Sequence, residues 1–468
     1  MTAQKSPKRW AGLVGVLILI VVLIPAVPAQ DMMYRYDAGH SGDYSPVAGA
    51  TGSNVSLFWS RTMEDQGNFF PAGGLTTPVI ANGTVYATGI HGELLALDAA
   101  TGRERWNASI FVYRSSPAVA KGIVYVGSNN GNVYALDAAT GKTIWTYPTS
   151  NEIDSSPVLA NGTLYISSLD GITYMTPDVA LYALNATTGE KIWNFTIGGS
   201  SDTSPAVADG TVFIGGDNGR VYALAAESGT IFWNTTIEGV AGSSPMVKDG
   251  LVYIGSNAGT IYALNETTGT RVWNFTMDGE LSSDPAIANG TVYINTKRGH
   301  VYALNAVTGE LRWSAQILNT NISEPFASPV IANGIIYICD YRSVNAFDAA
   351  GTLIWSWDFP DDNLMWGYTT SVIENGVLYG GRYTNDEWNP GGSTFRYKTT
   401  IYALDLNAGA SGIPISALTP APTTTASKTT APANAPSPAT GVPLAVSGIA
   451  LLAAVVLVSG LQRRKQHE

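Results

Sequence analysis

The sequence is poor in the residues that build covalent staples and metal sites. Its 468 residues include one cysteine, Cys339, which cannot form a disulfide within the chain and is interpreted as a small buried hydrophobe. Four histidines are scattered, and no Asp-rich calcium loop, Gly-rich phosphate loop or nucleophile elbow occurs. We therefore predict no metal site and no catalytic residue.

Positive charge is also scarce. The chain has 25 Lys and Arg against 36 Asp and Glu, a formal net charge of −11, and no basic run in its central part. Phosphate binding needs clustered Lys and Arg, so nucleic acid is excluded as the expected partner. Helical periodicity is nearly absent, whereas 50 glycines and many Tyr and Trp indicate numerous short strands and turns.

What the chain does contain is a repeated phrase, of which VYALDAATGKTIW at 133–145 is one copy. VYALD is typical of a short strand, and Asp137 can fold its carboxylate onto the following backbone N–H groups. Gly141 can supply the positive φ of a bulged hairpin loop, after which KTIW returns as a second strand. The phrase therefore predicts a β-hairpin with a tryptophan on its outgoing arm.

Copies of this phrase follow one another along the chain. Each is preceded by a second hairpin such as SSPAVAKGIVYVGSNNG at 115–131, so a unit holds four short strands in about 40 residues, as propeller blades do. The turn glycines are Gly102, Gly141, Gly189, Gly229, Gly269, Gly309 and Gly351, and the tryptophans four residues later are Trp106, Trp145, Trp193, Trp233, Trp273, Trp313 and Trp355.

The ends of the repeat region fix the number of blades. The eighth unit lacks its tryptophan strand after IYALDLNAG (401–409), and an orphan strand, VSLFWSRT at 55–62, precedes the first unit. We predict that Trp59 completes the eighth blade. The expected fold is an all-β, eight-bladed propeller of four-stranded antiparallel blades, closed by its N-terminal strand and followed by a transmembrane helix.

One tryptophan per blade at fixed spacing favours a structural role over a ligand cage or an electron path. Each ring can fill the gap between two sheets while its N–H finds a backbone carbonyl. Its removal is expected to cost about 3–5 kcal/mol.

The two ends of the chain predict export and anchoring. Residues 1–29 are typical of a signal peptide cut after Ala29, and 30–53 form a lead-in to the propeller at 54–412. A Thr/Pro/Ala-rich stalk (413–441), a membrane-spanning helix (442–461) and a basic cytoplasmic tail (462–468) follow. The alternatives are an uncleaved signal anchor and enzymatic sorting at SPATG (437–441).

Eleven Asn-X-Ser/Thr sequons occur, several of them explained equally well as turns. Those that directly follow a blade tryptophan are not required by any turn and are predicted to carry glycans: Asn107, Asn194, Asn234 and Asn274.

The pattern A-x-D-x-x-T-G-x-x-x-W resembles the tryptophan-docking repeat of the pyrroloquinoline quinone (PQQ) family of eight-bladed propellers, over about residues 55–412. This family includes quinoprotein alcohol and glucose dehydrogenases and non-enzymatic scaffolds, and the repeat does not separate them. The resemblance implies that the enzymes hold PQQ with Ca²⁺ over the channel, often beside adjacent cysteines and within large insertions. This chain has one cysteine and mostly minimal units, with longer inserts only at 169–180 and 383–400.

A small binding site is expected, if anywhere, at the channel mouth, where the residues before each first strand converge. An arginine among carboxylates there could bind a cation or a polar ligand, and a solvated rim with one salt bridge is the alternative. The candidates are Arg114, Asp154, Asp202, Glu324 and Trp366.

Taken together, the sequence predicts a surface propeller that binds or scaffolds a protein or an envelope polymer. It is anchored in the membrane by one helix, has no expected cofactor, and is of undetermined oligomeric state. The alternatives are a PQQ-dependent dehydrogenase, which would use PQQ with Ca²⁺, and a structural surface-layer component.

Overall fold

The structure, a computed structural model, describes residues 37, 40–44, 55–64, 76–149, 151–168, 179–198, 203–281, 283–317, 327–340, 342–359, 365–386 and 396–407. All of them belong to one compact unit, Met1–Ala421. Within these ranges every regular element is a β-strand, and no helix capable of spanning a membrane is found. The signal peptide, stalk, membrane helix and tail that the sequence predicts lie outside the described residues.

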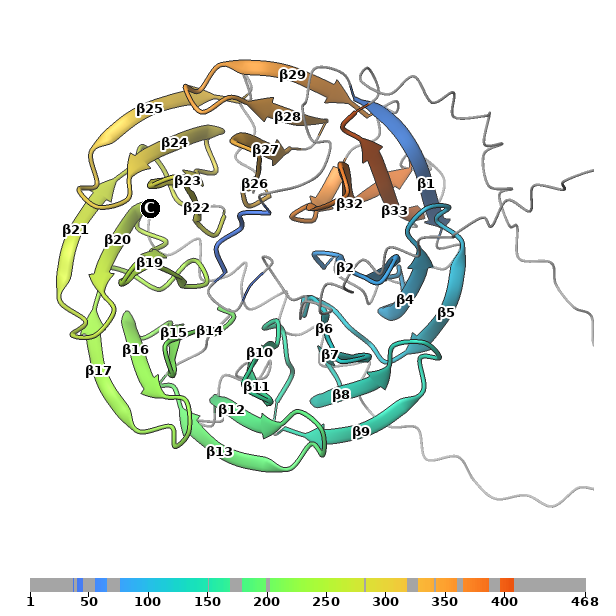
Figure 1. Cartoon of the computed structure of the whole chain (residues 1–468), viewed down its shortest axis with the longest axis horizontal. Coiled ribbons are helices and arrows are strands. Elements are labelled where there is room, and N and C mark those ends of the chain that lie inside the picture. Colours follow the sequence, from blue (N-terminus) through green and yellow to red (C-terminus); the bar gives the residue numbers. More distant parts are fainter. Residues whose placement is uncertain are drawn as a thin grey trace, which may run out of the picture. The chain divides into compact units, whose positions relative to one another are not determined.

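Eight antiparallel sheets stand around a central channel, which confirms the predicted propeller (Figure 1). The strands of the first three blades are β2 (Val79–Ala81), β3 (Thr84–Thr88), β4 (Glu93–Asp98) and β5 (Glu104–Ser109); β6 (Ala118–Ala120), β7 (Ile123–Gly127), β8 (Asn132–Asp137) and β9 (Thr143–Pro148); and β10 (Val158–Ala160), β11 (Thr163–Ser167), β12 (Ala180–Asn185) and β13 (Lys191–Thr196).

The next four blades repeat this order. They contain β14 (Ala206–Ala208), β15 (Thr211–Gly216), β16 (Arg220–Ala225) and β17 (Ile231–Thr236); β18 (Met246–Lys248), β19 (Leu251–Gly255), β20 (Thr260–Asn265) and β21 (Arg271–Thr276); β22 (Ala286–Ala288), β23 (Thr291–Asn295), β24 (His300–Asn305) and β25 (Leu311–Gln316); and β26 (Val330–Ala332), β27 (Ile335–Cys339), β28 (Ser343–Phe347) and β29 (Leu353–Asp358).

The eighth blade is built from both ends of the propeller. Strands β31 (Val372–Glu374), β32 (Val377–Asp386) and β33 (Arg396–Asp405) come from its C-terminal end, and β1 (Ser56–Glu64) pairs with β33 as the outer strand. Trp59 lies opposite Ala403 beside a β-bulge, the same register that Trp106 and Ala96 have in the first blade. The N-terminal strand therefore closes the ring, as predicted.

Blades form because each unit alternates tight turns with strands that are buried on both faces. Asn82 and Gly83, with φ of 51° and 68°, make the two-residue turn that joins β2 to β3. The inner strands are rich in Val, Ile, Leu and Ala and almost wholly buried, as strands sandwiched between neighbouring sheets must be. The core is thus a set of apolar layers, one between each pair of blades.

Candidate functional site

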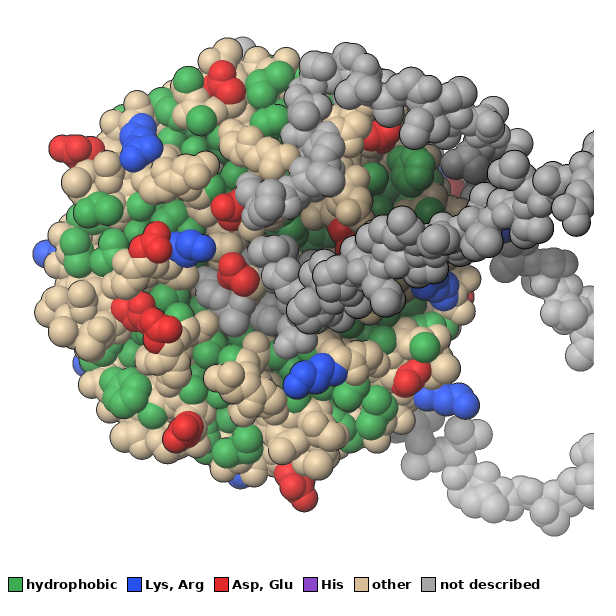
Figure 2. All heavy atoms as spheres, in the orientation of Figure 1, with side chains coloured by type: hydrophobic (Ala, Val, Ile, Leu, Met, Phe, Trp, Pro, Cys, Tyr) green, Lys and Arg blue, Asp and Glu red, His purple; other side chains and the backbone are tan. Residues whose placement is uncertain are grey.

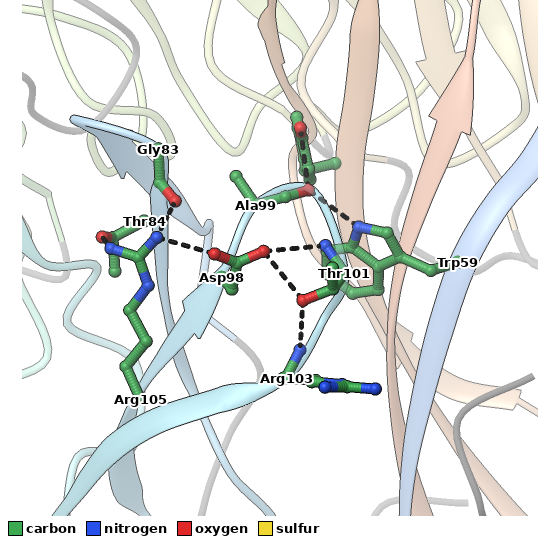
Figure 3. Close-up of polar contacts among 9 residues, drawn as sticks. Trp59, Gly83, Thr84, Asp98, Ala99, Thr101, Arg103 and Arg105 are labelled. Atoms are coloured by element: carbon green, nitrogen blue, oxygen red, sulfur yellow. Dashed lines mark hydrogen bonds and ion pairs between the residues drawn. The ribbon is translucent and has the colours of Figure 1, made fainter. Parts of the chain in front are cut away.

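In the first blade the repeated hairpin turn is held by the carboxylate of Asp98 (Figure 3). Oδ1 of Asp98 accepts hydrogen bonds from the backbone N–H and the hydroxyl of Thr101, at 3.0 and 2.8 Å. Oδ2 accepts one from Arg105 at 2.7 Å, and this bond, with those from Thr101, lowers the pKa of Asp98. The turn is a locally satisfied structure rather than a reactive one.

The blade tryptophans interlock consecutive blades. Trp59 of the eighth blade donates its indole N–H to Ala99 O in the first blade at 2.8 Å, and a Cβ on Gly102 would lie 2.6 Å from its ring. The same arrangement recurs, with N–H···O distances of 2.8–3.1 Å, at Trp106, Trp145, Trp193, Trp233, Trp273 and Trp313. Each tryptophan thus rests on the turn glycine of the next blade, where no other residue leaves room.

The interface between blades seven and eight departs from this rule. There the indole nitrogen of Trp355 and the hydroxyl of Tyr337 are both buried, with no hydrogen-bond partner in the described part of the chain. In five other interfaces the corresponding tyrosine shares the tryptophan's acceptor, as Tyr86 does with Ala138 O at 3.1 Å. The ring packing is unchanged, because Tyr337 and Trp355 lie 5.9 Å apart, as Tyr86 and Trp106 do.

A second series of hydrogen bonds joins consecutive blades near the centre of the ring. In seven of the eight units the residue before the first-strand proline donates its backbone N–H to the side-chain oxygen of its counterpart in the next blade, at 2.7–3.2 Å. In the eighth unit Thr370, which precedes Ser371, accepts the last of these bonds. The members, called here the inner girdle, are Thr77, Ser116, Ser156, Ser204, Ser244, Asp284, Ser328 and Thr370. The sequence contains these residues in SSP, TSP and SDP triplets, but it does not show that each of them bonds to its counterpart in the next blade.

A short part of the predicted lead-in, His40–Tyr44, lies inside the ring, which the sequence did not predict. Residues His40–Tyr44, called here the channel segment, are almost completely buried apart from Asp43. Tyr44 N donates to Ile331 O at 2.8 Å and Ile331 N donates to Gly42 O at 3.0 Å, as in an added parallel strand. Figure 1 shows the segment, in blue, inside the ring beside β22 and β26.

The channel segment also contacts two further blades. Ile287 N in β22 donates to Ser41 O at 2.9 Å, and the His40 ring lies 3.2 Å from Pro245 O, just before β18. The channel segment therefore contacts the inner edges of blades five, six and seven, by the His40 ring at blade five and by backbone at the other two.

The predicted channel-mouth residues are only partly brought together. Arg114 lies 3.7 Å from the carboxylate of Asp154, and Asn129 lies 3.3 Å from it. Asp202 and Glu324 lie outside the described residues; Trp366 belongs to β30 (Met365–Tyr368), but its side chain lies outside them too. Across the described ranges no three His, Cys, Asp or Glu side chains gather to hold a metal ion. What is seen is one loose ion pair on the rim.

Charge on the visible face is dispersed. Figure 2 shows Lys and Arg lying singly among Asp and Glu, without a continuous patch of one sign.

The insert of the eighth unit lengthens that blade. Strands β32 and β33 have 10 residues each, against five or six in the matching strands of the other blades, and pair as far as Asp386 and Arg396. β30 and β1 run along the two sides of this extension, where Glu64 meets Lys398 at 3.2 Å. The insert of the third unit falls mainly on 169–178, outside the described residues.

The four sequon asparagines after blade tryptophans occupy one equivalent place. Asn107, Asn194, Asn234 and Asn274 lie in the outermost strands β5, β13, β17 and β21, and all four are exposed. By contrast, Asn185 and Asn265 are half-buried turn residues whose side-chain oxygens accept backbone hydrogen bonds. The outer-strand asparagines are thus sterically open to modification.

These features define a closed eight-bladed propeller with interlocked blades. Comparison with known proteins identifies the family to which this propeller belongs. A family model described as "Outer membrane protein assembly factor BamB" matches residues 47–117 and 177–411. A second, described as "Glucose/ethanol/alcohol dehydrogenase, beta-propeller domain", matches 107–204. Because the first match spans more than half of the chain, the protein belongs to this family of PQQ-like repeat propellers.

Solved structures agree on the fold. BamB from Moraxella catarrhalis is 18% identical with a TM-score of 0.56, covering 75% of this chain and 97% of that one. Quinohemoprotein alcohol dehydrogenases from Pseudomonas putida and Comamonas testosteroni are each 16% identical, with TM-scores of 0.63 and 0.62. They cover 93% and 81% of this chain, and 85% and 81% of their own. No match was found among curated proteins.

Proposed function

We propose that this protein is a binding and scaffolding propeller, displayed outside the cell on a membrane-anchored stalk, for a protein or an envelope polymer. The signal peptide at 1–29, the stalk at 413–441 and the apolar run at 442–461 support that location. The single observation that carries the scaffold role is the channel segment, which lies inside the ring against blades five to seven.

Because the channel segment occupies part of the centre of the ring, we place the partner site on the outside of the ring. The lengthened eighth blade is its most distinctive part, because β32, β33 and β1 extend together past the length of an ordinary blade. Family membership supports the same role, since BamB is by its name an assembly factor.

The test is site-specific photo-crosslinking in the native envelope. A photoreactive residue replaces Glu64, which is half exposed on the extension, and in a matched control replaces Ile192 on the outer strand of blade three. A discrete adduct from position 64 that is absent from position 192 is the expected result. No adduct from position 64, or the same adducts from both, would contradict a partner site on this blade.

A PQQ-dependent dehydrogenase is the second candidate, favoured by the family match over 107–204 and by the dehydrogenase structures. Among the described residues no three His, Cys, Asp or Glu side chains gather to hold a metal ion, and the channel segment lies inside the ring. Calorimetric titration of PQQ with Ca²⁺, followed by a dye-linked alcohol oxidation assay, separates the two. Micromolar one-to-one binding with dye reduction would replace the scaffold proposal.

A further inference from the structure

A groove of about 420 Å³ lies where the eighth blade meets the first. It is lined by side chains from the outer strand of one blade and from the two outer strands of the next, together with two loop residues. The lining residues used below are Arg61 from β1, Leu95 from β4, Glu104, Asn107 and Ser109 from β5, and Phe111.

The aromatic pair that fills the corresponding place in some other interfaces is absent here. In blades three and four the residue opposite the outer-strand asparagine is a tyrosine that packs against an aromatic ring of the preceding blade. These pairs are Tyr147–Tyr182, with centroids 5.8 Å apart, and Phe195–Tyr222, at 5.3 Å. At the meeting of blades eight and one the equivalent pair is Arg61 and Leu95, and both side chains line the groove.

Asn107 is opposite Leu95 and lies in the lining of this groove. It begins the sequon Asn-Ala-Ser, and Ser109 lines the groove as well, because residues two apart in a strand share a face. The amide of Asn107 donates to Glu104 Oε1 at 2.5 Å, and Glu104 Oε2 accepts from Arg61 at 2.6 Å. The asparagine is therefore both exposed and held in one orientation.

Phe111 supplies the apolar surface. Its side chain is 55% exposed, and its backbone has φ of 52°, the left-handed region that a bulky residue seldom adopts. A strained backbone that presents an exposed aromatic ring is the kind of outlier that marks ligand sites.

We propose that Asn107 carries an N-linked saccharide whose first sugar lies in this groove against the ring of Phe111. The donor is a sugar activated through an anomeric phosphate ester, such as a lipid-linked one. The bond from Asn107 Nδ2 to the anomeric carbon forms, the bond from that carbon to the phosphate oxygen breaks, and the phosphate leaves as Nδ2 gives up one proton. Nδ2 keeps its second hydrogen, which can still be donated to Glu104.

The chemistry of the groove matches this occupant. A sugar ring offers C–H surface to an aromatic face and hydroxyl groups to charged partners, here Arg61 and Glu104. The volume falls within the roughly 300–1,000 Å³ typical of small-molecule sites. At Asn194 and Asn234 the tyrosines fill the corresponding space, so saccharides there would extend into solvent.

The test compares two sequons in the full-length chain, secreted by a host that attaches N-acetylglucosamine-based glycans. Glycopeptide mass spectrometry measures occupancy at both sites, and thermal unfolding compares Asn107→Gln with the matched control Asn194→Gln. We expect Asn107 to be occupied and Asn107→Gln to lower the midpoint by roughly 2 °C, with no change in the control. Phe111→Ala should give the same loss, and the double variant no further loss.

In a second experiment the same variants are made in a host that does not glycosylate them, and their unfolding midpoints are compared. There neither Asn107→Gln nor Phe111→Ala should change the midpoint, because the sugar they act through is missing. A bare Asn107 beside an occupied Asn194, or equal midpoints for the two glutamine variants, would overturn the proposal. This inference rests on the proposed export of the chain, and the two can fail separately. A chain that is not secreted would refute the proposed location. A secreted chain with a bare Asn107 would refute only the proposed saccharide in the groove.

Discussion

Replacing Trp313 and Trp355 by phenylalanine removes the same atoms from two neighbouring blade interfaces with different consequences. Both rings are half-buried, and each has a tyrosine ring 5.9 Å away, Tyr293 and Tyr337 respectively. They differ in the indole hydrogen bond: Trp313 donates its N–H to Ala349 O at 2.9 Å, whereas the Trp355 nitrogen has no partner in the described chain.

The magnitude follows from that difference. A neutral hydrogen bond contributes about 0.5–1.5 kcal/mol net, and leaving a buried donor unpaired already costs about 1–3 kcal/mol in the native state. Trp313→Phe loses the bond and some packing, whereas Trp355→Phe loses packing and also removes the unpaired donor. The free energy of unfolding should therefore fall by at least about 1 kcal/mol more at Trp313 than at Trp355.

Equilibrium unfolding in guanidinium chloride, followed by tyrosine and tryptophan fluorescence, measures both variants against the parent chain. Trp313→Ala and Trp355→Ala serve as controls for ring removal and should each cost about 3 kcal/mol, the lower end for a large aromatic because the rings are only half-buried. Equal losses for the two phenylalanine variants would refute the reasoning. So would a larger loss at Trp355.

Three other outcomes are expected. Gly229→Ala should lower the free energy of unfolding by about 2–4 kcal/mol in the same assay, because its Cβ would lie 2.7 Å from the Trp193 ring at a φ of 70°. Hydrogen bonds from Arg105 and Thr101 lower the pKa of Asp98, so Asp98 stabilises the fold above its unfolded pKa and loses this contribution as pH falls through the lowered value. Arg105→Met should therefore make the free energy of unfolding fall less steeply below about pH 4, as acid titrations of unfolding measure. At pH 7 the variant should lose no more than about 1 kcal/mol, because the pair is exposed. Burial raises the pKa of Cys339 to about 11, so a maleimide should leave it unmodified in the native chain at pH 8 and label one thiol per chain after unfolding.

The fold was predictable because its information is local and repeated. The Asp137-to-Trp145 phrase specifies a hairpin by itself, and its recurrence turns one local inference into a blade count. Even the closure by Trp59 followed from counting, since a ring with one missing strand and one spare strand has a single solution.

Features that depend on how blades are placed against one another were not predictable. The inner girdle needs Ser116 to face Ser156, 40 residues away, and nothing in either triplet specifies that neighbour. The channel segment is short and polar, so hydropathy gave no sign that it would be buried. The groove arises from Leu95 standing where the repeat has tyrosine, an exception visible only against the pairing of β4 with β5.

The pairing of β1 with β33 also sets the order in which the chain can fold. Thr62 and Thr400, whose hydroxyls lie 2.9 Å apart across these strands, are separated by 338 residues. At about 5–20 residues per second, the first strand to be synthesised waits roughly 20–70 s for its partner. During that time Leu57 and Trp59 lie on an unpaired strand edge, the kind of segment that invites pairing with another chain. The ring therefore becomes safe from such misassembly only when its last strand has been made, and every earlier blade must be stable without closure.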